Sequence, residues 1–273
     1  MSGDYVIEDV EAEGHVYRRL VFTSTPMIVQ SEARLKSVTA KKKSKKKLTL
    51  DTGYLSCQHH VAMVAGLGFI PNLQQFNEGE VSVLLIGLGG GGLATFLHQY
   101  FRQVNLTVVD IDEAMVSIAT DWFGFVKDDL LSVQVCDGIE LVNKEVEKGV
   151  KRHIVMLDVD SKDTSVGMSC PPQAFVQESF LLALKQLLWN EGVLILNLVC
   201  RDEEMRKSVL KQLPQVFNKV FVKDIDEEVN QIVYAINRTD ESESRKDSSD
   251  IKAQVESKEI SQYLSSCVKG SSV

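Results

Sequence analysis

The sequence predicts an α/β fold: a Rossmann-like sheet of seven strands, preceded by an N-terminal β-hairpin extension. Three observations predict it. Apolar runs of strand length alternate with segments of helical spacing between residues 81 and 213, which is typical of a parallel sheet covered by helices. A glycine-rich turn follows the first of these strands. Two more β-rich segments, 216–222 and 232–236, follow the last helix and fit an antiparallel hairpin that closes the sheet.

The N-terminal region, residues 1–53, is expected to form the hairpin. Two β-rich runs between residues 16 and 35 flank the turn sequence Thr23-Ser-Thr-Pro26. Seven lysines follow within residues 36–47. Because like charges repel and no apolar residue anchors them, this segment is predicted to be a disordered loop. Leu48–Asp51 resumes the hairpin, and residues 54–67 have apolar side chains at helical spacing.

Residues 54–238 are expected to form the cofactor-binding domain. Its predicted strands are 81–86, 105–110, 131–136, 153–158 and 193–200, and its predicted helices are 92–103, 113–122, 138–148, 173–189 and 202–213. Pro214 is expected to end the last helix, because proline cannot continue the helical hydrogen bonds. From residue 239 the composition changes to Ser, Asp, Glu and Lys, so 239–273 is predicted to be a disordered acidic tail.

The glycine-rich turn predicts a nucleotide-cofactor site. Gly87-x-Gly89-x-x-Gly92 matches the dinucleotide fingerprint, and Asp110 follows at about the expected 20 residues. Glycine at positive φ lets the backbone approach a ligand, and the helix N-terminus offers unpaired N–H groups. The candidates for cofactor binding are therefore Gly87, Gly89, Gly91, Asp110 and Ile111. A packing turn without a ligand is the alternative, and it is disfavoured because so many glycines destabilise a turn that has no other use.

The next two strands also end on a carboxylate. Asp137-Gly138 follows one of them and Asp158 follows the other. Ligands of open α/β sheets bind at the carboxyl ends of strands, so we expect Asp137 to accept the adenine amino group and Asp158 to face the reacting end of the cofactor. This arrangement resembles the S-adenosylmethionine-dependent methyltransferases. That resemblance implies S-adenosyl-L-methionine as cofactor and S-adenosyl-L-homocysteine as product. A nicotinamide cofactor is the weaker alternative, because the chain has no Tyr-x-x-x-Lys pair.

Over about residues 16–237 the chain resembles the spermidine synthase-like branch of class I methyltransferases. Arg18-Arg19-Leu20, Ile28-Val-Gln-Ser-Glu32, Tyr54 and Gln58 carry this likeness, together with the strand-end acids. The segments 54–60 and 84–93 are similar to the C-terminal domain in the family of dual methyltransferases of translation elongation factor 1-alpha. That resemblance implies a seven-stranded methyltransferase sheet and methylation of the α-amine at the factor's N-terminus.

Two departures from the family pattern argue against polyamine synthesis. Aminopropyltransferases have an aspartate in the glycine loop where this chain has Gly90, and an Asp-Ser-Ser-Asp-like motif where it reads Asp158-Val-Asp-Ser-Lys162. Many methyltransferases also have an acid just before the loop, where this chain has Leu85 and Ile86. A spermidine synthase-like aminopropyltransferase and a catalytically silent binding module are the remaining alternatives. The intact glycine turn favours retained cofactor binding.

Methyl transfer to an amine requires the lone pair of that amine. An α-amine has a pKa of about 7.7–8.0, against about 10.4 for lysine, so far more of it is neutral in the cytosol. Carboxylates can attract the ammonium, orient it and accept its proton, which makes Asp158 and Asp160 the catalytic candidates. By analogy with the aminopropyltransferase branch, Gln30 and Gln58 are candidates for contact with the cofactor or the acceptor.

No metal site is predicted. The five cysteines lack ligand spacing. The adjacent His59 and His60 are expected to diverge, because neighbours on a helix face lie three or four residues apart. An odd number of cysteines and a cofactor of intracellular metabolism favour a reducing, cytoplasmic location.

The formal charge of −8 conceals an asymmetry. Seven of the 30 Lys and Arg residues lie within residues 36–47, so the rest of the chain is more acidic than the total charge. This balance argues against direct nucleic-acid binding and favours a basic protein partner. The resemblance implies that this partner is translation elongation factor 1-alpha. The lysine run as a nucleic-acid or localisation patch is the weaker alternative. The longest apolar stretches are too short to span a bilayer, so no membrane partner is expected.

Overall fold

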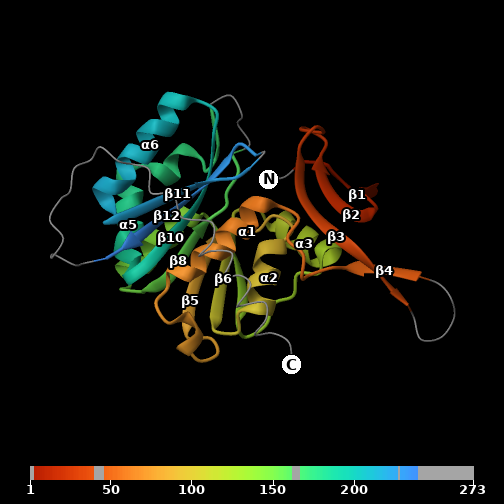
Figure 1. Ribbon diagram of the computed structural model, residues 1–273, viewed down its shortest axis with the longest axis horizontal. Coiled ribbons are helices and arrows are strands. Elements are labelled where there is room, and N and C mark those ends of the chain that lie inside the picture. The colour runs from red at the N-terminus through yellow and green to blue at the C-terminus, as the bar shows by residue number, and fades with distance from the viewer. Residues whose placement is uncertain (1–2, 40–45, 162–166, 227, 239–273) are drawn as a thin grey trace.

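The computed structural model describes residues 3–39, 46–161, 167–226 and 228–238, which form two sheets (Figure 1). The smaller sheet is antiparallel, in the order β1-β2-β3-β4, and the larger has the order β11-β12-β10-β8-β5-β6-β7 with β9 paired to β10. The strands of the smaller sheet are β1 (Tyr5–Ala12), β2 (His15–Phe22), β3 (Val29–Thr39) and β4 (Lys46–Leu50). Those of the larger are β5 (Val81–Ile86), β6 (Val104–Asp110), β7 (Leu131–Val135), β8 (Arg152–Leu157), β9 (Met168–Cys170), β10 (Leu188–Cys200), β11 (Lys219–Asp224) and β12 (Asn230–Asn237).

The helices connect the strands of the larger sheet. They are α1 (Gln58–Ala65), α2 (Gly92–Tyr100), α3 (Glu113–Phe123), α4 (Gly138–Glu147), α5 (Glu178–Leu187) and α6 (Glu203–Val216), with short 3-10 turns at Gly66–Phe69, Leu73–Gln75 and Gln173–Val176. Strands β5, β6, β7, β8 and β10 run parallel, while β12 runs antiparallel to β10 and β11. The predicted seven-stranded Rossmann-like path is therefore confirmed, with β9 as an addition. Three residues are too few to give a strand signal in the sequence.

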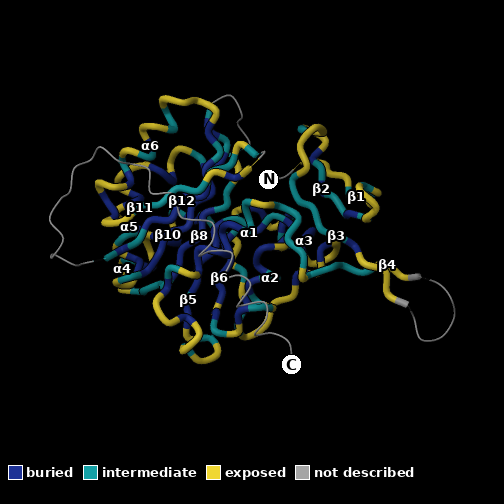
Figure 2. The backbone as a smooth tube through the Cα atoms, viewed as in Figure 1, coloured by how far each residue is buried: buried dark blue, intermediate teal, exposed yellow. Residues whose placement is uncertain are grey.

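The core lies on both faces of the larger sheet. Side chains of β5 alternate between two clusters: Val83 and Leu85 pack with α1 and α2, whereas Leu84 and Ile86 pack with α4, α5 and α6. The central strands are the most deeply buried part of the chain (Figure 2). A strand with both faces covered reads as an unbroken apolar run, which is why residues 81–86 showed no polar alternation.

The smaller sheet packs against the larger domain through α3. Leu20 and Phe22 of β2 are buried with Met115, Ile118 and Phe123 of α3. In Figure 1 this sheet stands beside α3, away from α5 and α6. Burial of one face of β2 thus fixes the extension next to the glycine turn that precedes α2.

The N-terminal extension is larger than the predicted hairpin. A further strand, β1, pairs with β2 along its whole length. Residues 36–39 and 46–47 of the predicted disordered loop belong to β3 and β4, which are paired from Leu35↔Leu50 to Thr39↔Lys46. The pairing of β3 with β4 satisfies the backbone groups of both strands here. Residues 40–45, like the predicted disordered tail 239–273, lie outside the described residues.

Two predicted helix ends are wrong. The predicted helix 173–189 is a 3-10 turn followed by α5, and β10 already begins at Leu188. The last helix continues through Pro214 to Val216, whose side chain is buried in the core. In the final turn Lys185 Nζ donates to the carbonyl of Val216.

Candidate functional site

The predicted site residues come from three parts of the chain and gather at the carboxyl edge of the larger sheet. Gly87, Gly89 and Gly91 form the turn between β5 and α2; Asp110, Ile111, Asp137, Gly138, Asp158 and Asp160 end or follow β6, β7 and β8; Gln30 lies on β3, and Gln58 opens α1. Parallel strands present their carboxyl ends at one edge, so residues far apart in sequence meet there.

The turn after β5 requires glycine at its first position. Gly87 has φ +101°, and a Cβ there would overlap the carbonyl oxygen of Asp158 and lie 2.7 Å from its carbonyl carbon. The neighbouring strands are joined at this point, since the Asp158 N–H donates to the carbonyl of Ile86 (2.9 Å). Glycine therefore lets the end of β5 approach the end of β8 closely enough to bring the turn and Asp158 together.

Asp110 holds the glycine turn in place. One carboxylate oxygen accepts from the Leu88 N–H (3.0 Å) and the other from the Asp112 N–H (2.9 Å). These two bonds fix the carboxylate at the tip of β6. Each oxygen has a further lone pair, so the predicted contact with ribose hydroxyls remains compatible with them. Ile111 beside it is 71% exposed and offers an apolar surface at the same edge.

The smaller sheet contributes to the turn as well. The Gly90 N–H donates to Ser31 Oγ of β3 (2.8 Å). A Cβ at Gly90 would lie 3.0 Å from Ser31 Cβ and 3.2 Å from the ring of Phe123. An aspartate at position 90, such as aminopropyltransferases carry in this loop, would require Ser31 or Phe123 to shift by a few tenths of an ångström.

Asp137 caps α4. Its Oδ1 accepts from the N–H groups of Ile139 (2.7 Å) and Glu140 (3.2 Å), and this cap holds the carboxyl group at the end of β7. A Cβ at Gly138 would lie 2.5 Å from Ile86 Cγ2, so Gly138 permits α4 to pack against β5. A contact between Asp137 and the adenine amino group stays a prediction.

Asp158 is the centre of a hydrogen-bonded network. Asn197 Nδ2 donates to its Oδ1 (2.9 Å), and His60 Nε2 lies 2.9 Å from its Oδ2. Asn230 Nδ2 in turn donates to Asn197 Oδ1 (2.9 Å). The Asp158 side chain is 21% exposed, so it is held firmly and still reaches the site. Burial favours its neutral form, but the hydrogen bond and charge of His60, with His59 and Asn197, outweigh burial and hold the pKa of Asp158 well below its usual range.

Asp160 differs from Asp158 in its electrostatics. Loss of part of its hydration and the negative charge of Asp158 raise the pKa of Asp160 to about 6. Gln30 Nε2 donates to Asp160 Oδ2 (3.4 Å), which links β3 to the loop after β8 and acts in the opposite direction on that pKa. The carboxyl pair thus combines a permanently ionised group with an exposed one that titrates near neutrality.

The expectation that His59 and His60 diverge is wrong. Their ring centroids are 4.4 Å apart, and His59 Nδ1 lies 3.2 Å from Glu228 Oε2. Both imidazoles sit in the first turn of α1, where His60 lies against Asp158 after β8 and His59 against Glu228 before β12. Possible metal-ligating atoms of Cys57, His59 and His60 lie within 4.8 Å of one another, and among the described residues they form one group with metal-ligand chemistry.

Sequence reasoning missed His60, Asn197, Asn230 and Ser31. Asn197 had a signal: it is a polar residue inside the apolar strand 193–200, and it is only 3% exposed. A buried amide in a strand needs partners, and here they are Asp158 and Asn230. Gln58, by contrast, is exposed on α1, and no contact of the described residues joins it to another predicted site residue.

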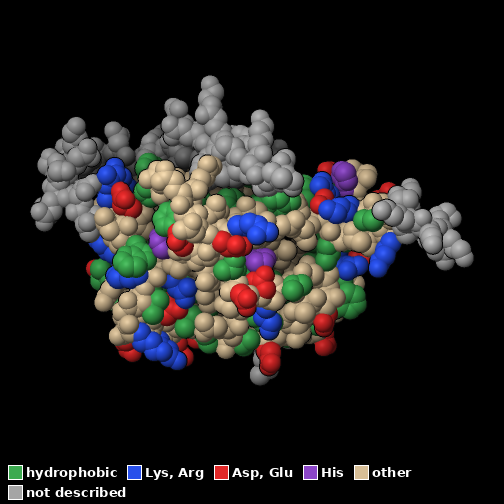
Figure 3. All heavy atoms as spheres, turned by 90° about the horizontal axis from the view of Figure 1, so that it is seen from below, with side chains coloured by type: hydrophobic (Ala, Val, Ile, Leu, Met, Phe, Trp, Pro, Cys, Tyr) green, Lys and Arg blue, Asp and Glu red, His purple; other side chains and the backbone are tan. Residues whose placement is uncertain are grey.

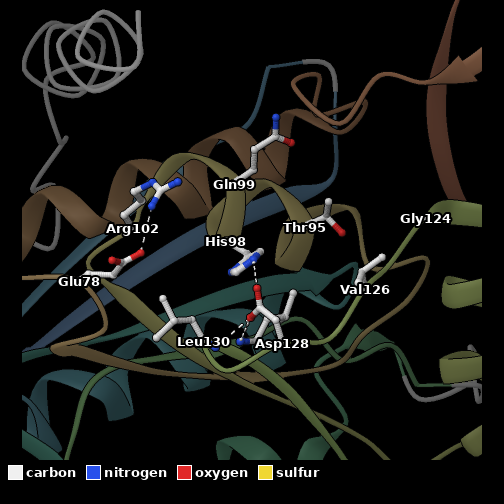
Figure 4. Close-up of a pocket in the computed structure, with 10 residues that line it drawn as sticks. Glu78, Thr95, His98, Gln99, Arg102, Gly124, Val126, Asp128 and Leu130 are labelled. Atoms are coloured by element: carbon white, nitrogen blue, oxygen red, sulfur yellow. Dashed lines mark hydrogen bonds and ion pairs between the residues drawn. The ribbon is translucent and has the colours of Figure 1, made fainter. Parts of the chain in front are cut away.

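A separate pocket of about 410 Å³ lies away from this site, between α2 and the loop before β7 (Figure 4). Its walls carry two ion pairs, His98–Asp128 (2.9 Å) and Arg102–Glu78 (3.1 Å). Across the face shown in Figure 3, acidic and basic side chains are interspersed among the described residues. Within the described part of the chain, no helix is both long and apolar enough to cross a membrane.

Residues 63–238 match the spermine/spermidine synthase domain family. The chain is 44% identical over 253 residues to the eEF1A lysine and N-terminal methyltransferase of Xenopus laevis, and 43% identical over 258 residues to that of Homo sapiens. These matches cover 85% and 86% of this chain but 36% and 37% of the relatives, so the chain spans just over a third of their length.

Solved structures of related proteins are also similar to this chain. Human methyltransferase-like protein 13, crystallised with SAH, is 38% identical, with a TM-score of 0.68; the match covers 78% of this chain and 93% of that one. A probable spermidine synthase from Corynebacterium glutamicum has a TM-score of 0.59 at 17% identity, covering 85% of this chain and 80% of its own, and shows the fold alone.

Proposed function

The chain belongs to the spermine/spermidine synthase domain family, and from this premise we propose that it is an S-adenosylmethionine-dependent protein methyltransferase that acts on the N-terminal α-amine of translation elongation factor 1-alpha (eEF1A). The observation that carries the proposal is the position of Asp158. Its ionised carboxylate lies at the end of β8, directly against the glycine turn at Gly87. From this position Asp158 can attract a cationic acceptor beside the turn that would bind the methyl donor.

The cofactor assignment rests on the fit of the turn and on the relatives. When bound, S-adenosylmethionine supplies a methyl group on a sulfonium, whose S–C electron pair returns to sulfur as S-adenosylhomocysteine is released. We assign the backbone contacts with the cofactor, which carries no phosphate, to Gly87, Gly89 and Gly91. Asp110 and Asp137, with Ile111 and Gly138 beside them, would hold the nucleoside; Gln30 and Gln58 would border the acceptor side. The relative crystallised with SAH supports this choice.

The glycine at position 90 favours transfer of a methyl group over transfer of an aminopropyl group. An aspartate in the loop, as in aminopropyltransferases, would press against Ser31 and Phe123 and require one of them to shift. The catalytically silent binding module is also disfavoured, since the relatives that match 85–86% of this chain are named methyltransferases and the carboxylate network is intact.

An α-amine suits this site better than a lysine. The relatives' names include both lysine and N-terminal methylation, and this chain spans just over a third of their length. The pKa of an α-amine lies about 2.5 units below that of lysine, so its neutral form is several hundredfold more populated near pH 7. The basic groups of this site are carboxylates and imidazoles. They can therefore remove a proton from an α-amine more readily than from a lysine.

The test is methyl incorporation from labelled S-adenosylmethionine into eEF1A with a free or a blocked N-terminus. We expect labelling with the free amine and loss of at least about 90% of it on blocking, because chemistry at the terminus needs that lone pair. Label retained on the blocked protein would move the acceptor to a side chain. No label on either form, with S-adenosylhomocysteine still bound, would favour the silent module.

Asp160 predicts a pH dependence in acceptor binding. Its pKa of about 6 means that its charge is complete above pH 7 and is lost as the pH falls below 6. The KM for an α-amine peptide is therefore expected to rise about threefold to fivefold from pH 7.5 to pH 5.5, the range for an exposed ion pair. In Asp160→Asn the KM should be high and independent of pH. A wild-type KM that does not change with pH would contradict an ionic contact of Asp160 with the acceptor.

The partner and location follow from the same proposal. A basic protein, eEF1A, is the expected substrate of a chain whose body is acidic outside residues 36–47. The described cysteines are free thiols, in keeping with the cytoplasmic location that the cysteine usage predicts.

A further inference from the structure

The two faces of the smaller sheet have different surroundings. Leu20 of β2 lies on the face that packs on α3. Side chains alternate along a strand, so Tyr17 and Val21 lie on the opposite face, which we call the outer face. Tyr17 is paired with Arg34, and Arg34 Cζ lies 3.7 Å from the centre of the Tyr54 ring, just before α1. The outer face therefore turns toward the segment that enters α1, beside the candidate site.

A β-bulge at Gln30 connects the outer face to the site. The pairing of β2 with β3 shifts between Ser31 and Val29, so Gln30 is an extra residue in β3. Gln30 Nε2 donates to Asp160 Oδ2 (3.4 Å). The neighbouring Ser31 Oγ accepts from the Gly90 N–H (2.8 Å). Val29 therefore begins a surface that adjoins the carboxyl groups on the acceptor side of the site.

A row of valines crosses the outer face from this point. Val29 of β3 is paired with Val21 of β2, and Val21 is paired with Val6 of β1. Residues paired in this way share a face, so the three side chains form one apolar strip, here called the valine row. Val29 is 44% exposed and Val6 is 47% exposed, and Ile28 and Met27 in the adjoining turn are exposed as well. The solvent face of an antiparallel sheet is normally polar, so this exposed apolar strip indicates a surface for a partner.

Charged side chains lie beside the valine row on the same face. The next paired row is Glu8, Arg19 and Glu32, in which Arg19 Nε donates to Glu32 Oε2 (2.6 Å). Two carboxylates thus accompany one guanidinium, and the excess negative charge favours a cationic partner, as the carboxylate of Asp158 does. A polypeptide with a positively charged terminus followed by apolar side chains suits both the charged row and the valine row.

We propose that the valine row binds the acceptor polypeptide, through an extended segment with apolar side chains that follows the α-amine. The inference rests on the proposed function and deepens it, since it names the surface that recognises the acceptor beyond its terminus. With the amine at Asp158 and Asp160, the segment leaves the site past Gln30 and crosses the row. Neighbouring strands lie about 4.8 Å apart, so the row is about 10 Å across, the length of about three extended residues. Contact there adds affinity without entering the chemistry, so its loss should raise KM and leave kcat unchanged.

The first test measures methyl transfer to two peptides from the eEF1A N-terminus, one of about two residues and one of about fifteen. Only the longer peptide reaches across the valine row, at about 3.3 Å per extended residue. In the double variant Val6→Thr/Val29→Thr, threonine keeps the β-branched shape and the preference for strands, so the pairing of the sheet should be retained. We expect its KM for the longer peptide to rise about fivefold or more, because apolar contact is lost. Its KM for the shorter peptide should stay within about twofold of wild type.

Val38→Thr is the matched control. Val38 also lies on β3 and is 45% exposed, but it is paired with Lys47 at the other end of the strand, about 30 Å from Val29. Its KM for the longer peptide should stay within about twofold of wild type. A second readout needs no turnover: in the complex with S-adenosylhomocysteine, the methyl NMR signals of Val6 and Val29 should shift when the longer peptide binds, whereas those of Val38 should not.

The outcomes separate the inference from the proposed function. If the double variant raises KM for the longer peptide no more than Val38→Thr does, the valine row is not the acceptor surface, and the function still stands. Equal wild-type KM values for the two peptides, or valine signals that do not shift, overturn the inference as well. If the double variant binds S-adenosylhomocysteine more weakly than wild type, Val6→Thr alone, on the edge strand away from Gln30, decides the question. A wild-type enzyme that labels neither peptide overturns the proposed function, and the inference fails with it.

Discussion

Replacing Asp158 by asparagine is expected to lower kcat for an α-amine acceptor by about 10²- to 10⁴-fold, the range for a positioned acid–base group. Asparagine keeps the size of the side chain and its bond from Asn197, but it loses the negative charge that attracts the ammonium. It also leaves His60 facing an amide in place of a carboxylate. Affinity for S-adenosylhomocysteine, measured by calorimetry, should remain within about threefold, because the glycine turn is unchanged.

The same substitution predicts a change in stability with a defined sign. The pKa of Asp158 is lower in the folded than in the unfolded chain, so its charge stabilises the fold above pH 4, and this contribution is lost as the pH falls. Asp158→Asn should therefore reduce the free energy of unfolding by about 2 kcal/mol at pH 7, and this difference should begin to shrink only as the pH falls below about 4. Asp128→Asn, which alters the His98 pair, is the control. For activity, a kcat of Asp158→Asn within about threefold of wild type would refute the role of Asp158 in attracting the acceptor amine.

Replacing Gly87 by alanine is expected to abolish cofactor binding and to destabilise the fold by about 3 kcal/mol or more. The new Cβ would overlap the backbone carbonyl of Asp158, and backbone atoms cannot rotate away as the end of a side chain can. The ends of β5 and β8 would have to separate, and the turn would move with them. We expect thermal unfolding to shift down by several degrees and the Kd for S-adenosylhomocysteine to rise at least about 100-fold.

Gly149 provides a matched control for this prediction. Its φ of +70° is also in the left-handed region, but no atom lies within 4 Å of a Cβ built there. Gly149→Ala therefore measures the cost of the backbone conformation alone, about 1–2 kcal/mol. The difference between Gly87→Ala and Gly149→Ala in the free energy of unfolding therefore measures the cost of the overlap with Asp158. If Gly87→Ala bound S-adenosylhomocysteine like wild type, the close approach of the two strands would not be needed.

Much of the fold could be predicted because its signals are local. The buried strand 81–86, the glycine turn and the acids after β6, β7 and β8 each lie within a few residues of one another, and parallel strands bring their ends together. Asp158 is in the predicted position beside the turn. The strand β1 and the ends of the lysine loop were missed because their pairing is decided by neighbouring strands and not by their own composition.

The partners of Asp158 could not be predicted in the same way. His60 is 98 residues away in sequence and Asn197 is 39 away, and neither has a spacing that ties it to Asp158. Ser31 is 59 residues from Gly90, and only the docking of β2 on α3 brings it to the turn. The wrong expectation that His59 and His60 diverge treated the helix as isolated, whereas Glu228 and Asp158 orient both rings.

The sequence by itself determined the α/β class, the parallel sheet implied by the alternation of strands and helices, and the acids that meet at the sheet edge. Those features depend on periodicity and on residues that stand next to each other in the chain. Only the tertiary structure decided which groups surround Asp158, which side chains press on position 90, and why the two carboxyl groups titrate so differently. Charge, burial and hydrogen bonding depend on distances between segments that the sequence keeps far apart.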